Sequence, residues 1–66
     1  MLDEILELKD KIEKDFDGAF ISLWEENGLW KIIVCYKGSM ISLIELDDFK
    51  CLMELHHIKL MLIYMR

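Results

Sequence analysis

Two side chains that could share a metal ion stand three residues apart in the last third of the chain. Glu54 and His57 have the i, i+3 spacing at which a carboxylate and an imidazole on one helix can reach the same metal. A di-metal site of that kind needs four carboxylates and two histidines, and the sequence has no second Glu-x-x-His motif. Both residues also fall on the most polar side of the helix predicted there. We interpret them as a solvated face and expect no metal and no cofactor.

The other reactive side chains are one histidine and two cysteines. His56 lies within an apolar stripe, which favours a histidine at the edge of the core and leaves a buried, pH-sensitive group as the alternative. Cys35 and Cys51 have apolar neighbours and no cluster of basic residues or second cysteine to lower a thiol pKa, so we expect inert thiols. No glycine-rich phosphate loop is present, and 66 residues leave little room for a cavity of roughly 300 Å³. We do not expect an enzyme.

Acidic side chains are concentrated in the first part of the chain. Residues 1–26 hold nine acids against three lysines, a net charge of −6, whereas residues 27–66 hold four acids and five bases, a net charge of +1. Such a face on a helix usually serves solubility. The alternative hypothesis is that Glu4, Glu7 and Asp10 imitate nucleic-acid phosphates and bind the basic cleft of a nucleic-acid-handling protein. The total charge of −5 argues against direct binding to nucleic acid.

Length and composition predict one compact domain over residues 1–66. Apolar residues make up 55% of the chain, proline is absent and glycine occurs three times, which predicts order nearly from end to end. The longest apolar run, residues 60–65, is far shorter than the roughly 20 residues of a bilayer-spanning helix. With two cysteines and no signal-peptide pattern at the first residues, we expect a cytoplasmic protein without a membrane partner.

The apolar pattern changes its period along the chain. Apolar residues recur at helical spacing through residues 1–16, which predicts an amphipathic helix. From Ala19 onward the period falls to two, and Asn27-Gly28 is a strong signal for a type I′ hairpin turn. We expect the second two-residue loop at Gly38-Ser39, which gives three antiparallel strands in meander order.

A second helix is predicted after the strands. Asp47 and Asp48 can cap its first turn, and no breaker interrupts residues 49–64. Residues 58–65 are also compatible with a fourth strand, which remains the alternative. The predicted fold is therefore α+β, with an N-terminal helix, a three-stranded antiparallel meander and a C-terminal helix.

Two-residue loops assign every strand residue to a face of the sheet. In this register Leu23 faces Ile32, and Val34 faces Leu43. The predicted core face carries Ala19, Ile21, Leu23, Trp30, Ile32, Val34, Tyr36, Ile41 and Leu43, with Glu25 and Glu45 at its margins. The opposite face carries an apolar patch of Phe20, Trp24, Ile33, Cys35, Met40 and Ile44, with Leu46 at its end. Two helices on one face would leave this patch bare.

The second helix carries two apolar stripes on opposite sides. One consists of Phe49, Leu52, Met53, Leu60 and Ile63, and the other of Cys51, Leu55, Ile58, Leu62 and Met65. We expect the first stripe to pack on the sheet and the second to remain for a partner, unless the first helix covers it.

Spare apolar surface on a small acidic chain favours protein binding. We expect a stoichiometric inhibitor or regulator of another protein, for example a phage-encoded inhibitor of a host defence system, that acts as a homo-oligomer. The alternative is a structural oligomerisation module. The predicted protein-binding residues are Phe20, Trp24, Ile33, Ile44, Leu55, Ile58, Leu62, Glu4, Glu7 and Asp10.

Overall fold

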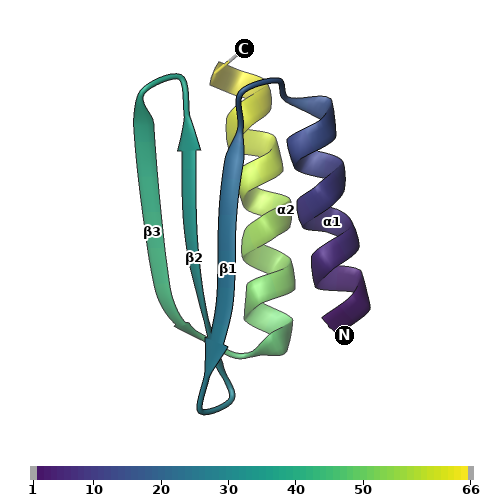
Figure 1. Ribbon diagram of the computed structural model, residues 1–66, viewed down its shortest axis with the longest axis vertical. Helices are drawn as coiled ribbons and strands as arrows, with labels where there is room; N and C mark the ends of the chain where they lie inside the picture. Colours follow the sequence, from purple (N-terminus) through teal and green to yellow (C-terminus); the bar gives the residue numbers. More distant parts are fainter. Residues whose placement is uncertain (1, 66) are drawn as a thin grey trace.

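The computed structural model describes residues 2–65 and has the predicted order of elements. Helix α1 spans Leu2–Asp15, strands β1, β2 and β3 span Phe20–Glu26, Leu29–Tyr36 and Ser39–Leu46, and helix α2 spans Asp48–Met65. The sheet is antiparallel in the order β1-β2-β3. Both helices lie on one side of it and run in the same direction (Figure 1). This is an α+β fold. Residues 58–65 belong to α2, and Met1 lies outside the described residues.

Helix α1 packs through one stripe and ends at a glycine. Ile5 and Ile12 are buried, and Phe16 follows them into the core. The Ala19 N–H donates to the Phe16 carbonyl over 3.0 Å, and Gly18 has a φ of 86° between them. A left-handed residue after the last turn is the usual way in which a helix ends at glycine. The chain thereby reverses direction and enters β1.

The first hairpin has the predicted turn and register. Asn27 and Gly28 have φ values of 54° and 79°, so both central residues are left-handed as a type I′ turn requires. Leu23 pairs with Ile32, as predicted.

The second hairpin turns one residue earlier than predicted. Its left-handed pair is Lys37 and Gly38, with φ values of 50° and 81°, so glycine takes the second turn position as Gly28 does. Val34 therefore pairs with Ile41, and the predicted pairing with Leu43 is wrong. The error moves the partner by two residues, so both side chains stay on the predicted face.

Strand β3 contains a bulge that the sequence pattern did not predict. Leu43 pairs with Ile32 and Leu46 with Trp30, so two residues of β3 stand opposite the single Lys31. One of the two, Glu45, has a φ of 59°. The extra residue exchanges the two faces beyond it. Leu46 consequently packs against the core, and its predicted place on the opposite face is wrong.

The core lies between the sheet and the two helices. Its buried side chains are Ile5, Ile12, Phe16, Ile21, Trp30, Ile32, Val34, Tyr36, Cys51, Leu55, Ile58 and Leu62. Asp47 caps α2 as predicted, because its carboxylate accepts the Lys50 N–H over 2.8 Å. The adjacent Asp48 accepts a hydrogen bond of 2.7 Å from the Trp30 indole, which ties the first turn of α2 to β2. None of the helices in residues 2–65 is long and apolar enough to cross a membrane.

Candidate functional site

The sheet face away from the helices, which we call the far face, exposes large apolar side chains. Phe20, Met40 and Ile44 are 61%, 71% and 61% exposed, and Trp24 is 38% exposed. Ile33 lies half-buried among them. Neither helix covers these residues, since both pack on the opposite face (Figure 1). The far face is therefore the bare surface that the strand register predicted.

Cross-strand pairing arranges the far face in rows. Phe20 pairs with Cys35 and Cys35 with Met40, which makes a row across the three strands whose outer side chains are large. The next row on this face joins Ser22, Ile33 and Ser42, so its outer positions are small. The row after that begins with Trp24 opposite Lys31, whose amino group lies 3.3 Å from the Glu26 carboxylate. The face thus has large apolar side chains at one end, a single apolar side chain between two serines in its centre, and Trp24 beside an ion pair at the other end.

The predicted assignment of the two stripes of α2 is wrong. Leu55, Ile58 and Leu62 are buried in the core together with Cys51, so they are not free surface in this chain. Most of the stripe on the Phe49 side faces solvent instead, and only its Leu52 is half-buried against the core. That stripe contains His56, whose ring nitrogens would need partners if they were buried, whereas the buried stripe contains no polar residue. The uninterrupted stripe is the one that packs without loss of hydrogen bonds.

The solvent side of α2, which we call the outer face, is a surface that sequence reasoning missed. Phe49 and Leu60 are 62% and 55% exposed, and Met53, Ile63 and Tyr64 are exposed as well. The interrupting His56 was the available signal in the sequence. The molecule thus has exposed apolar residues on both of its layers.

The three carboxylates proposed for binding lie on the helix layer. Glu4, Glu7 and Asp10 are exposed residues of α1, and Asp10 is 3.7 Å from the amino group of Lys9. Because α1 and the far face are on opposite sides of the sheet, one flat partner surface cannot contact both (Figure 1).

A further acid of α1, Glu13, has a structural role that the charge pattern did not reveal. One carboxylate oxygen accepts the Ile21 N–H over 2.9 Å, and the other accepts from the Lys9 amino group over 2.7 Å. Burial by itself raises the pKa of Glu13, but the hydrogen bonds from Lys9 and Ile21 outweigh it and hold the pKa below its ordinary value. Glu13 therefore joins α1 to β1 as a carboxylate.

The histidines and the acid predicted beside them are surface groups. The His57 Nδ1 lies 3.6 Å from the Glu54 carboxylate, and both residues are accessible to solvent. His56 is exposed, so the alternative of a buried histidine is wrong. Within residues 2–65, no three His, Cys, Asp or Glu side chains converge in a way that could hold a metal ion.

The two thiols differ in their surroundings. Cys51 is buried in the core, and burial followed by the charge of Asp48 raises its pKa to about 11. A thiol with so high a pKa stays protonated near neutral pH, which makes it a poor nucleophile. Cys35 is half-buried on the far face.

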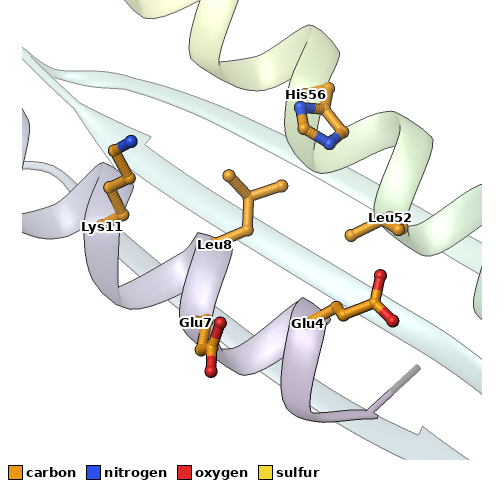
Figure 2. Close-up of a pocket in the computed structure, with 6 residues that line it drawn as sticks. All are labelled: Glu4, Glu7, Leu8, Lys11, Leu52 and His56. Atoms are coloured by element: carbon orange, nitrogen blue, oxygen red, sulfur yellow. The ribbon is translucent and has the colours of Figure 1, made fainter.

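Among the hollows on the surface of residues 2–65 are two that charged side chains line. One, of about 260 Å³, lies between the two helices and is lined by Glu4, Glu7, Leu8, Lys11, Leu52 and His56 (Figure 2). The other, of about 530 Å³, is lined by Glu25, Gly28, Asp47, Asp48 and Phe49. In the second hollow, Asp47 and Asp48 already accept hydrogen bonds that hold the start of α2. We therefore assign these two carboxylates a structural role.

Comparisons of the chain with models of protein families, with curated proteins and with solved structures found no match.

Proposed function

We propose that this chain is a protein-binding module that acts as a stoichiometric inhibitor or regulator of another protein, through the far face of the sheet. The observation that carries the proposal is the exposure of Phe20, Trp24, Met40 and Ile44 on a face that neither helix covers. Several large apolar side chains exposed on one face of a small chain are typical of a binding site. Trp24 is the anchor in this proposal, because tryptophan is enriched among residues that dominate binding energy.

The chemistry of the far face specifies the kind of partner. The face has large apolar side chains at one end, Ile33 between two serines in its centre, and the Lys31–Glu26 pair beside Trp24 at its other end. A matching partner presents an apolar patch, and the net charge of −5 attracts a partner with basic surroundings. The binding energy then comes from apolar burial, and the charge contributes chiefly to the rate of association.

The acidic residues of α1 contribute to that rate in a salt-dependent way. The shortest extent of the molecule is 15 Å, whereas charges are screened over about 8 Å at physiological ionic strength. Reversal of Glu4, Glu7 and Asp10 to lysine should therefore slow association at low salt and have little effect at physiological salt. Equal slowing at both salt concentrations would indicate direct contact, as in the hypothesis of a basic cleft that binds α1.

A structural oligomerisation module is the second candidate, and the outer face of α2 favours it. Phe49, Leu60 and Tyr64 are exposed there in one helix, a pattern that suits packing against another helix. Such a module binds copies of itself and nothing else, so the two candidates differ in whether a second kind of protein is bound.

Affinity capture with matched variants tests the proposal. Tagged wild-type chain, Trp24→Ala and Ile44→Lys would be used to capture proteins from a lysate of the source cell, with Leu60→Glu as a control on the other layer. We expect one protein to be retained in stoichiometric amount by the wild type and the control, and lost from both far-face variants. The proposal fails if no protein follows this pattern.

A further inference from the structure

The exposed residues of α2 follow the spacing of a helix-packing seam. Phe49, Met53, His56, Leu60 and Ile63 are separated by steps of four, three, four and three residues. All five are exposed, so no other element within residues 2–65 covers this seam. Steps that alternate between three and four keep side chains along one side of a helix. The side chains of a second helix can then insert into the spaces between them.

The seam is long enough to hold a helix in place. It runs over 15 residues of α2, and its 14 steps of 1.5 Å give about 21 Å, or four turns. Four of its five members are apolar and only His56 is polar. A single polar residue in such a seam sets the register of pairing, because a shift would place it against apolar side chains.

We propose that the outer face of α2 binds the same face of a second copy of this chain, so that two α2 helices pack in parallel about a two-fold axis. This interface is distinct from the far face, so it goes beyond the binding of another protein. In a parallel pair each seam residue meets its own equivalent, and His56 meets His56 of the second copy. Apolar residues therefore face apolar residues at the other four positions of the seam.

Charge favours the parallel over the antiparallel arrangement. Residues 2–15, which form α1, hold six acids and three lysines, a net charge of −3. Helix α1 lies on the side of α2 marked by Leu52, since both line the hollow between the helices (Figure 2). Lys50, Glu54 and His57 lie about 140–160° around the helix from Leu52, on the other side.

Symmetry then decides what each α1 meets. A two-fold axis parallel to α2 places α1 of each copy over the side of the other copy that carries Lys50, Glu54 and His57, whose formal charges cancel when histidine is neutral. An antiparallel pair would instead place α1 over α1, and their net negative charges would repel each other.

The available area suits a dimer of moderate affinity. The exposed residues of the outer face are Phe49, Met53, His56, Leu60, Ile63 and Tyr64. At roughly 100 Å² for each of them, an interface would bury about 600 Å² per copy and about 1,200 Å² in total, the lower limit for specific interfaces. We therefore expect dissociation in the micromolar range.

Sedimentation equilibrium over micromolar concentrations tests the interface. The wild-type mass should rise with concentration from 7.9 kDa toward twice that value. Leu60→Glu and Met53→Lys should each raise the dissociation constant at least tenfold and leave the circular dichroism unchanged, because both side chains are exposed. The matched control is Ile44→Glu, a similarly exposed apolar residue of the far face, which should leave the dimer intact.

Two results would overturn the proposal. One is a wild-type chain that stays monomeric throughout the range. The other is a dimer that persists in Leu60→Glu and Met53→Lys, and its loss in Ile44→Glu would then identify the far face as the self-association surface. Since Leu60→Glu is expected to retain the captured partner, failure of the dimer and failure of the proposed function are distinguishable.

Single cysteines test the orientation. In a Cys35→Ser background, Met53→Cys should form a disulfide-linked dimer on oxidation, because a parallel pair brings residue 53 against its own equivalent. In an antiparallel pair, Met53→Cys would instead form a disulfide with Leu60→Cys when the two proteins are mixed. Neither variant would then form a disulfide-linked dimer by itself. That second result would refute the parallel arrangement.

Discussion

The two tryptophans of this chain have different surroundings, and their replacement by alanine provides a sharp test of which way the sheet faces. Trp30 is 5% exposed on the core face, and its indole N–H donates to Asp48 over 2.7 Å. Trp24 is 38% exposed on the far face, where no helix lies over it. Trp30→Ala therefore creates a cavity and removes a hydrogen bond, whereas solvent fills the space left by Trp24→Ala.

The expected losses in unfolding free energy follow from these contacts. A buried tryptophan costs about 3–5 kcal/mol on truncation to alanine, and loss of a hydrogen bond to a carboxylate adds about 1.5 kcal/mol or more. For Trp24, burial of somewhat over half of a side chain that buries about 150–250 Å² when covered gives about 2–4 kcal/mol as an upper estimate. The stability of a chain of this size is about 3–10 kcal/mol.

Urea unfolding followed by far-ultraviolet circular dichroism compares the two variants. Trp24→Ala should remain folded with a lowered midpoint, and fluorescence of its remaining Trp30 should report a single transition. Trp30→Ala should be largely unfolded in buffer. If Trp24→Ala loses as much stability as Trp30→Ala, the far face is not a free surface and the proposed binding role of Trp24 is wrong.

Two further predictions concern Glu13 and the thiols. The lowered pKa of Glu13 means that its contribution to stability is present above its unfolded pKa near 4.5 and is lost as pH falls through its lower folded pKa. Glu13→Gln should thus lose about 1 kcal/mol at neutral pH, and urea titrations at decreasing pH should show the gap closing below pH 4.5; a constant gap contradicts this. A thiol reagent at mildly alkaline pH should modify Cys35 in the folded chain and Cys51 only after unfolding, since the pKa of Cys51 is about 11; equal rates would refute its burial.

The local sequence determined the elements and most of the strand faces. Asn27-Gly28 predicted a turn correctly because few other dipeptides accept two left-handed residues. Gly38 was ambiguous, since a glycine can take either central position of a two-residue turn, and Lys37 gave no signal for the left-handed conformation that it adopts. The bulge at Glu45 depends on pairing with β2, so no pattern within β3 alone could predict it.

The orientation of α2 was the larger error, and it affected the predicted site. Both stripes of this helix are apolar at helical spacing, so periodicity alone cannot tell which one is buried. The choice was decided by His56, which is tolerated in solvent and would be costly in the core. Leu55, Ile58 and Leu62 were consequently predicted as binding residues although they form the core. On the sheet, alternation was sufficient, because Trp24 and Leu23 must point to opposite faces.

Amide NMR is the most direct test of whether the far face of the sheet binds a protein partner. The partner identified by affinity capture would be titrated into isotope-labelled chain carrying Leu60→Glu, so that self-association does not contribute. We expect the largest amide shift changes in the strand rows that contain Phe20, Trp24 and Ile33, with saturation at one partner per chain. Shifts confined to α1 and α2, with the sheet unchanged, would contradict it.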